Sequence, residues 1–260
     1  IDEGTVENST VSKNTAPAGV EPHGGGITVG KGVVGEGTSV AIDTSTIVEN
    51  TGGGIVVDLA GADLRNSTVV ANTNPTGSGG GVYLVSESPL SITSTILSDN
   101  VGDSGASDCA GSVDSHGHNI VGSLSGCGWA LASGDLIGVD PLLGPLTDNG
   151  GPTPTMAPTS RQSAAINTGS EPGDSDQRGL TRPVPIGEFN ADIGAVEVQA
   201  PSSDEGSPPQ ITPSSDLKIG DTLTCLPGEW DTDTIADPSY SYEWLAGATT
   251  VGTASTQGTK

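Results

Sequence analysis

The sequence predicts an all-β fold, a right-handed parallel β-helix, over residues 1–199, followed by a C-terminal β segment of a different kind. Three observations support this prediction: short β-branched runs recur at a regular interval, glycine triplets recur between them, and large side chains are scarce. The 260-residue chain contains 40 Gly and 18 Pro, and 3% of it is aromatic. So few large side chains form a thin, repetitive core, which suits a solenoid whose repeats pack only against neighbouring repeats.

One phrase of hydroxyl and β-branched residues recurs four times, and each copy leads to an asparagine. The copies are Asn8-Ser9-Thr10-Val11 before Asn14, Thr44-Ser45-Thr46-Ile47 before Asn50, Asn66-Ser67-Thr68-Val69 before Asn72, and Thr93-Ser94-Thr95-Ile96 before Asn100. The last copy is one residue longer. We expect the four final asparagines to stack as a ladder at a turn, because asparagine tolerates left-handed φ and its amide can bond to the copy above.

A second phrase, a glycine triplet followed by a β-branched residue, interleaves with the first. Its copies are residues 24–26 before Ile27, 52–54 before Ile55 and 79–81 before Val82, spaced 28 and 27 residues apart. A period in the twenties that holds short strand-like runs and no helical pattern is typical of one β-helix coil. Coils stack about 4.8 Å apart, and we expect the triplets to mark a corner that needs positive φ or close backbone approach.

The strongly negative charge excludes some partners. Asp and Glu number 32 against 8 Lys and Arg, which gives a formal net charge of −24. Nucleic acids and anionic membranes are therefore unfavourable partners. No apolar run is long enough to predict membrane insertion. Because the chain starts at Ile1 and shows neither a signal peptide nor an anchor, we expect a piece of a longer secreted or cell-surface protein.

Residues 108–197 contain a series of phrases that resembles a known family. In order they are Asp108-Cys109-Ala110-Gly111, GHNIVG at 117–122, Cys127, DPLLGPL at 140–146, DNGGPTP at 148–154, AAINTG at 164–169, DQRG at 176–179, Arg182-Pro183 and DIGAVE at 192–197. They resemble the choice-of-anchor Q domain of bacterial surface proteins. The resemblance implies an extracellular β-helix with no catalytic residues to transfer. The upstream repeats also resemble polymorphic outer-membrane-protein repeats.

From residue 208 the composition changes, and residues 208–230 and 240–244 resemble the first half of a bacterial immunoglobulin-like repeat. In such sandwiches a Cys pairs with a later Cys, yet none follows Cys225. About 50 residues with half of the strands cannot close a two-sheet core. We therefore divide the chain into a β-helix at 1–199 (repeat coils 1–107, family-specific coils and cap 108–199), a linker at 200–208 and a truncated immunoglobulin-like repeat at 209–260.

Two cysteines are candidates for a disulfide. Cys109 and Cys127 enclose 17 residues, and a bridge across such a loop contributes about 3 kcal/mol. The alternative is two buried thiols, which would need a reducing compartment.

Two arginines are candidates for structural salt bridges. We expect Arg178 and Arg182 to pair with Asp176, Asp192 or Glu197 and to tie the last coils together, rather than to bind a substrate.

Two hypotheses concern metals. Asp114, His116 and His118 alternate along an expected strand and could meet one ion, although a hydrogen-bonded turn is the preferred role for His118. Calcium is left open as a cofactor, because hard oxygen ligands cluster in one region: Asp99, Asp103, Asp108 and Asp114. We assign no metal site and no catalytic residue.

The leading functional hypothesis is a non-enzymatic extracellular or surface module, a rigid β-helical spacer that presents loops to glycans or cell-surface components. The rival is a polysaccharide lyase or glycoside hydrolase that acts in a groove of the β-helix, which needs paired carboxylates or a base. Basic and aromatic residues, which such sites use, are few. An open first coil also leaves an unpaired strand edge, which favours self-association.

Overall fold

The computed structural model describes residues 4–16, 24–30, 39–85, 87–103, 105–170, 173, 175–182 and 190–199, and within the C-terminal segment residues 202–203, 210–212, 222, 224–226, 230–231, 233, 235, 239–246 and 249–257. Across these residues the regular structure is β-strand, as the sequence predicts. Helices long and apolar enough to span a membrane are absent from the described chain.

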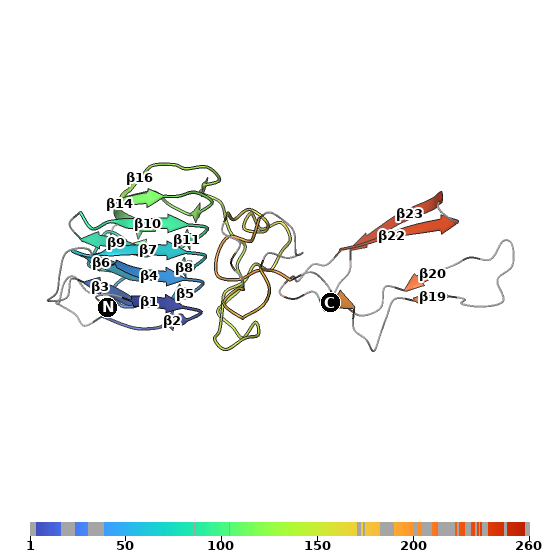
Figure 1. Cartoon of the computed structure of the whole chain (residues 1–260), viewed down its shortest axis with the longest axis horizontal. Helices are drawn as coiled ribbons and strands as arrows, with labels where there is room; N and C mark the ends of the chain where they lie inside the picture. Colours follow the sequence, from blue (N-terminus) through green and yellow to red (C-terminus); the bar gives the residue numbers. More distant parts are fainter. Residues whose placement is uncertain are drawn as a thin grey trace.

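Each of the first four coils contributes a strand to each of three parallel ladders (Figure 1). The first sheet contains β1 (Gly4–Glu7), β4 (Ser39–Asp43), β7 (Gly61–Arg65) and β10 (Leu90–Thr93). The second contains β2 (Thr10–Ser12), β5 (Thr46–Val48), β8 (Thr68–Val70), β11 (Ile96–Ser98), β15 (Ile120–Val121) and β17 (Leu136–Ile137). The third contains β3 (Ile27–Gly30), β6 (Ile55–Asp58) and β9 (Val82–Val85).

One long strand, β14 (Cys109–Ser115), joins the first and third sheets. Its start pairs with β9 and its end pairs with β10. Its middle pairs with β16 (Cys127–Trp129) in the next coil. The chain is therefore a parallel β-helix, which confirms the predicted fold class.

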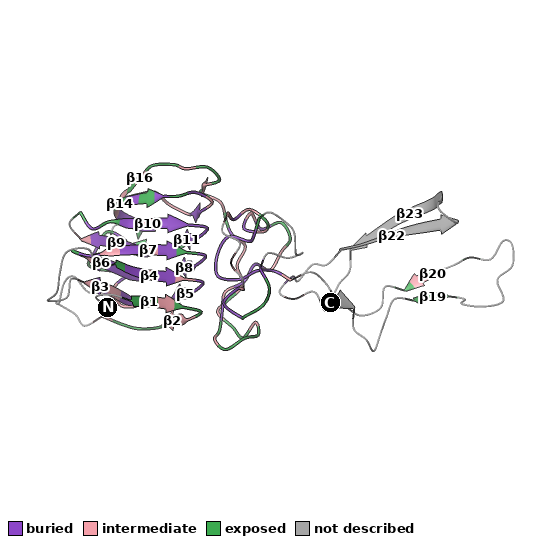
Figure 2. Cartoon of the chain, viewed as in Figure 1, coloured by how far each residue is buried: buried purple, intermediate pink, exposed green. Residues whose placement is uncertain are grey.

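The core follows from alternation along each strand, because successive side chains point to opposite faces. In the first sheet Val40, Ile42 and Leu64 point inward and are fully buried. They meet Ile55 and Val57 of the third sheet in one continuous apolar cluster, coloured purple in Figure 2. The few large side chains thus suffice, because every coil adds only a thin layer.

The second sheet is buried on both of its faces. Ile47 packs into the axial core, whereas its neighbour Val48 belongs to a second apolar cluster on the outer side. The recurring phrase is explained by this arrangement: its Thr points outward, and the next residue points to the axis. Strand pairing places Ile96 beside Thr68 and Leu97 beside Val69. The fourth copy of the phrase is therefore residues 94–97, and its first residue precedes Asn100 by six positions, as in the other three copies. The expectation that the last copy is one residue longer was wrong.

The four asparagines lie in one column, in which Asn50, Asn72 and Asn100 are buried and Asn14 is the exposed end. The backbone N–H and the side-chain amide of Asn50 both donate to Oδ1 of Asn72, at 3.0 and 2.9 Å. Asn72 donates in the same way to Asn100 at 3.0 Å, and Asn14 donates to Asn50 at 3.0 Å. Each amide also donates to a backbone carbonyl of its own coil or of the coil below. Every coil is thereby hydrogen-bonded to the next at the same corner.

The left-handed residue at this corner is the one before each asparagine, contrary to expectation. Positive φ occurs at Lys13, Glu49, Ala71 and Asp99, with values from 54° to 59°. The asparagines themselves are absent from the positive-φ residues. Asparagine is thus used here for its amide, which both donates and accepts, and not for its backbone tolerance.

The glycine triplets lie where the backbone passes close to the asparagine column. A Cβ on Gly54 would come within 2.9 Å of Asn72 Nδ2 and 2.8 Å of the Gly81 carbonyl oxygen. A Cβ on Gly81 would meet Asn100 Nδ2 at 2.7 Å. Real side chains do not tolerate such contacts, so the third glycine of the triplet permits the ladder to form, as expected for close approach.

A second column of hydrogen bonds follows the corner between the first and second sheets. At this corner the backbone N–H of one residue donates to the side-chain oxygen of the equivalent residue in the next coil. The residues in the column are Ser9, Ser45, Ser67, Thr95 and Asn119. Both columns end at a carboxylate. Asn100 donates to Asp108, and Asn119 donates to Asp135, each through its backbone N–H and its amide.

Residues 138–199 do not add coils in their described part. After β17 the chain runs along the outer face of the second sheet, as the yellow and orange trace in Figure 1 shows. Gln177 bridges Thr10 of the first coil and Thr46 of the second, at 2.8 and 2.6 Å. The Ala195 N–H donates to Thr68 at 3.1 Å. The expected run of coils thus ends near residue 137, and the rest is a lateral segment that covers one sheet.

The C-terminal segment forms antiparallel pairs. They are β18 (Ser202–Ser203) with β21 (Trp230–Asp231), β19 (Gln210–Thr212) with β20 (Thr224–Leu226), and β22 (Ser239–Ala246) with β23 (Thr249–Gln257). A further antiparallel pair, β12 (Val101–Gly102) with β13 (Gly105–Ala106), lies within the β-helix. The change from parallel to antiparallel pairing agrees with the predicted change of architecture after the β-helix.

We predict that Asn72→Ala lowers the free energy of unfolding by about 3 kcal/mol, because two buried donors of Asn50 lose their acceptor. Asn72 is fully buried, and its own amide bonds would also be lost. Urea denaturation monitored by circular dichroism measures the change.

Asn14→Ala is the matched control, since Asn14 is exposed and occupies the end of the column. Its cost should be about 1 kcal/mol or less. Equal costs at both positions would show that the column does not stabilise the stack through burial.

Candidate functional site

A disulfide joins Cys109 and Cys127, which confirms the predicted pair. It links the start of β14 to β16, and these strands pair in adjacent coils. Cys225 is a free thiol. The bridge fixes the last coils beside Asp108, where the asparagine column ends.

The pKa values of the two carboxylates at the column ends, Asp108 and Asp135, are shifted in opposite directions. Burial raises the pKa of Asp108, and hydrogen bonds from Asn100 and Ser123 only partly offset that effect. Burial acts in the same direction on Asp135, but bonds from Ala132, Ser115, Trp129 and Asn119 outweigh it and lower its pKa. Both residues close a hydrogen-bond column, so their protonation is linked to folding.

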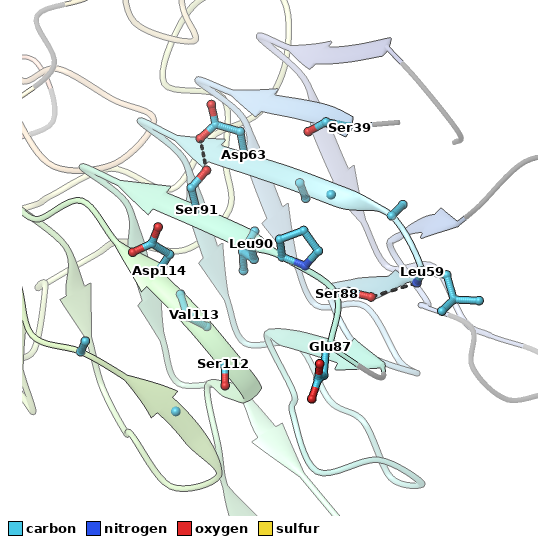
Figure 3. Close-up of a pocket in the computed structure, with 16 residues that line it drawn as sticks. Ser39, Leu59, Asp63, Glu87, Ser88, Leu90, Ser91, Ser112, Val113 and Asp114 are labelled. Atoms are coloured by element: carbon cyan, nitrogen blue, oxygen red, sulfur yellow. Dashed lines mark hydrogen bonds between the residues drawn. The ribbon is translucent and has the colours of Figure 1, made fainter. Parts of the chain in front are cut away.

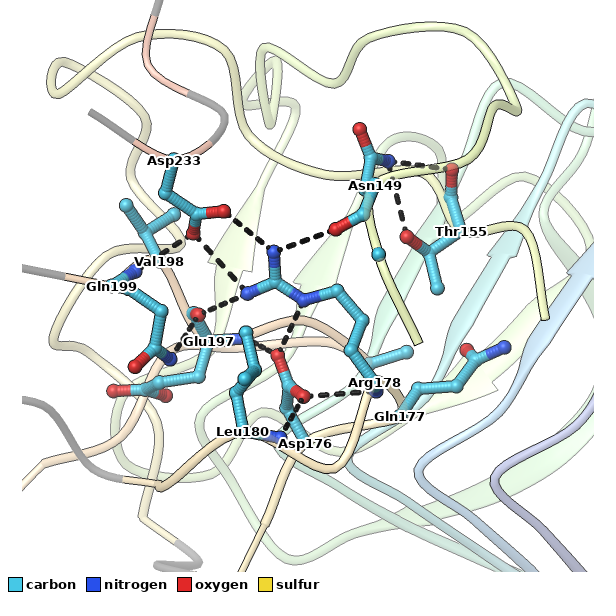
Figure 4. Close-up of polar contacts among 12 residues, drawn as sticks. Asn149, Thr155, Asp176, Gln177, Arg178, Leu180, Glu197, Val198, Gln199 and Asp233 are labelled. Carbon is cyan, nitrogen blue, oxygen red and sulfur yellow. Dashed lines mark hydrogen bonds and ion pairs between the residues drawn. The ribbon is translucent and has the colours of Figure 1, made fainter. Parts of the chain in front are cut away.

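Arg178 is the centre of a buried polar network (Figure 4). Its side chain is 0% exposed, and Nε donates to Asp176 at 2.9 Å. The terminal nitrogens donate to Asp233 at 2.7 and 3.2 Å and to the backbone oxygens of Asn149 and Glu197. Two charged partners raise the pKa of Arg178 despite its burial. Because Nε and both terminal nitrogens of this guanidinium donate to protein oxygens, Arg178 serves a structural role.

Arg182 is also buried, but it bonds mainly to backbone. It donates to the carbonyl oxygens of Gly194, at 2.9 Å, and of Asp192. Its Nε lies 3.8 Å from a Glu197 carboxylate oxygen. The Asp192 carboxylate instead accepts from the backbone N–H groups of Asn167 and Val198. Arg178 thus pairs with Asp176 and Arg182 with Glu197, two of the three acidic partners expected, whereas Arg182 reaches Asp192 through its backbone oxygen.

These two arginines do not tie the last coils together as expected. They join turns of the lateral segment to one another, and Arg178 reaches the C-terminal segment through Asp233. Asp233 also accepts from the Gln199 N–H at 2.9 Å, and nearby Ile235 is fully buried. Sequence reasoning missed Asp233, because it lies outside the phrases that carry the family resemblance.

The residues of the metal hypotheses do not converge. Asp114 lies 3.4 Å from His116, whereas His118 Nδ1 contacts the Thr168 carbonyl oxygen of the lateral segment at 2.7 Å. His118 occupies a turn with φ 57°, which matches its preferred role. Within the described ranges no three His, Cys, Asp or Glu side chains are grouped to hold a metal. Among the calcium candidates, both oxygens of Asp108 accept protein hydrogen bonds.

A groove with a volume of about 1150 Å³ lies on the outer face of the first sheet (Figure 3). This face has no lateral covering among the described residues, in contrast to the second sheet. Outward positions of β4, β7, β10, β14 and β16 form the floor, and register places Asp63, Ser91 and Asp114 in one column. Leu59 and Glu87, on the turns that enter the first sheet, contribute to the lining.

The carboxylates of the groove differ in their surroundings. Asp63 accepts from Ser91 at 2.8 Å and forms an ion pair with Arg65 at 2.6 Å. The Asp114 side chain is 78% exposed. They lie two strand spacings apart, roughly 10 Å. Leu59 adopts φ 55° and is 61% exposed. Its backbone N–H donates to the Ser88 hydroxyl oxygen at 2.9 Å. The groove thus combines an acidic, small-residue floor with an apolar side chain at its edge.

The sequence contains clues to the groove that are visible only once the register is known. Asp63 and Asp114 belong to no motif, and their shared column follows from strand pairing through Ser91. Leu59 is the one large apolar residue in the turn between β6 and β7.

Comparisons with known proteins identify no relative. No protein-family model, curated protein or solved structure matches the chain. The fold described above therefore stands on the structure alone, and the family resemblance remains a proposal.

We predict opposite pH dependences for the two column-end carboxylates. The folded pKa of Asp108 is raised above 3.8, so the stability from its protonated form is lost as pH rises from the unfolded pKa to the folded one. The folded pKa of Asp135 is lowered, so its contribution is lost as pH falls below the unfolded value of 3.8. Urea denaturation across about pH 2.5 to 7 measures both.

Asp108→Asn and Asp135→Asn separate the two effects. The stability of the unmodified protein minus that of Asp108→Asn should fall as pH rises, and the corresponding difference for Asp135→Asn should rise. Two differences with the same slope would contradict this assignment.

We predict that Arg178→Ala lowers the free energy of unfolding by about 3–5 kcal/mol, because it leaves the buried Asp176 carboxylate without its charged partner. Thermal and urea denaturation measure the loss.

Arg65→Ala is the control, since its ion pair with Asp63 is partly exposed and should contribute at most about 1 kcal/mol. Asp233→Asn should speed hydrogen exchange at the Gln199 amide if Asp233 anchors the C-terminal segment. An unchanged melt for Arg178→Ala would refute the structural role.

Proposed function

We propose that the protein is a non-enzymatic extracellular or cell-surface module, a stiff β-helical spacer that presents surfaces for binding. The observation that carries the proposal is the continuity of the buried asparagine column, because each coil is bonded to the next at one corner through Asn14, Asn50, Asn72 and Asn100. Bending the stack at this corner would break hydrogen bonds that water cannot replace in the interior.

Two further features support the role of a stiff spacer. The lateral segment crosses several coils, since Gln177 contacts Thr10 and Thr46 while Gly194 packs near Ile96. Asp233 then joins the C-terminal segment to the same network through Arg178. Successive parts of the chain are thereby fastened together, as a spacer requires.

The extracellular setting is part of the proposal. A disulfide forms and persists in oxidising compartments, and Cys109 and Cys127 form one. The phrases in residues 108–197 resemble the choice-of-anchor Q domain, and the C-terminal segment resembles a bacterial immunoglobulin-like repeat. Both resemblances suit a bacterial surface protein.

A glycan-cleaving enzyme is the second candidate, and the groove favours it. Asp63 and Asp114 flank Ser91 on one face, at a separation that approaches the range of an inverting glycosidase. However, Arg65 neutralises Asp63, and Asp114 is largely exposed, whereas a catalytic acid is usually kept protonated by burial or by a second carboxylate. The residues that line the groove contain no aromatic ring for stacking a sugar.

We predict that the full chain binds glycans on an array without releasing reducing sugar from them, in calcium and in chelator alike. Release of sugar from a bound glycan would overturn the spacer proposal. The double substitution Asp63→Asn and Asp114→Asn then serves as the control, since it should abolish cleavage if the groove is catalytic and leave the array pattern unchanged if binding occurs elsewhere.

A further inference from the structure

We infer that the groove on the first sheet binds an extended, positively charged peptide segment of a partner protein. This inference rests on the proposed surface function and names the partner class for one face of the spacer. It starts from an asymmetry of the fold: the second sheet is covered on its outer side by the chain's own lateral segment, and the groove-bearing face of the first sheet carries no such described segment.

The floor of the groove fits an extended chain. One column of outward positions consists of small or flat residues, namely Ser39, Gly61, Pro89, Ser112 and Gly128. The strands β4, β7, β10, β14 and β16 extend over four spacings, roughly 19 Å. Six residues of extended peptide cover that length at about 3.3 Å per residue. The backbone of such a peptide can lie close to the floor, because large side chains do not obstruct it.

The negative charge of the groove favours a positively charged partner. Glu87 and Asp114 contribute carboxylates, whereas Asp63 is already ion-paired with Arg65, and the lining contains neither Lys nor Arg among the described residues. Glu87 and Asp114 are exposed. Around them the protein has a formal net charge of −24, which repels anionic ligands and attracts cationic ones. Lysine or arginine side chains therefore complement the groove.

The edge of the groove supplies an apolar contact. Leu59 projects at a left-handed turn that disfavours most non-glycine residues, and its N–H is fixed by Ser88, which itself donates to the Val85 carbonyl at 2.7 Å. The turn thus holds an exposed leucine in one place (Figure 3). It can pack against the methylene stem of a bound lysine, since such stems lie along apolar surfaces while the charge stays solvated.

A sugar polymer fits the same groove less well. The lining residues include no aromatic side chain, and the large side chains nearest the floor, Leu90 and Val113, are buried. Loss of the glycan-array signal in the Asp63→Asn and Asp114→Asn double variant would place a glycan at this face and overturn the inference.

The test uses the full chain and fluorescein-labelled hexalysine, with a neutral hexapeptide of Gly and Ser as the reference probe. Fluorescence anisotropy at low and at moderate salt measures the dissociation constants. We expect hexalysine to bind and the neutral peptide not to bind. The double substitution Glu87→Gln and Asp114→Asn should weaken hexalysine binding about fivefold or more.

A matched variant separates a local site from general attraction by the net charge. Asp140→Asn with Asp148→Asn removes two exposed carboxylates from the lateral segment, and asparagine preserves the turns that they form. It should change the dissociation constant less than twofold. Leu59→Asn should also weaken binding, because asparagine keeps the left-handed backbone but lacks the apolar contact.

Equal weakening by both double variants would overturn the inference, since it would show attraction by net charge alone. Failure of hexalysine to bind would also overturn it. If the glycan array is then positive without sugar release, the spacer proposal stands while the peptide inference fails, so the two can be distinguished.

Discussion

The structure depends on one constraint: an asparagine amide must sit at the same buried corner of every coil. Its Oδ1 accepts two bonds from the coil on one side, and its amide donates to the coil on the other. Neither a carboxylate nor an aliphatic side chain can do both. A carboxylate occupies only the last position of the column, at Asp108, because there is no following asparagine to which the residue must donate. The close glycines follow from the same requirement, because Gly54 and Gly81 leave the space that the amides occupy.

The covering of the second sheet is the second determinant of the architecture. A β-helix with three bare outer faces would expose Val48, Val70 and Ile96, yet these residues are buried together with Ala165 and Ile193 of the lateral segment. The threonines beside them are satisfied by Gln177 and by a backbone N–H. The lateral segment needs its own anchor because it has no regular strands in its described part. The buried network of Arg178 and Asp176 supplies that anchor, and it extends to Asp233.

Repetition explains which features the sequence could predict. The asparagine spacing defined the column and the fold, because residues that recur with the period must stack. Register within a copy was less certain: Thr93-Ser94-Thr95 offers a hydroxyl at each position, so composition alone did not reveal that Ser94 and Thr95 align with Asn66 and Ser67. The lateral course of residues 138–199 could not be inferred, since non-repeating phrases carry no period that places them. Asp233 escaped for a related reason, because an ion pair 55 residues apart leaves no local pattern.

The distribution of carboxylates indicates what the acidity is for. Those that are buried or half-buried have specific partners: Asp108 and Asp135 close the hydrogen-bond columns, and Asp176 balances Arg178. On the first sheet the exposed carboxylates of Glu87 and Asp114 lie beside a floor of small residues. A stack of coils therefore creates an ordered acidic surface at no cost to its core, because alternation sends each outward residue to the face and each inward residue to the axis. Stiffness and a charged binding face are thus two consequences of the same register.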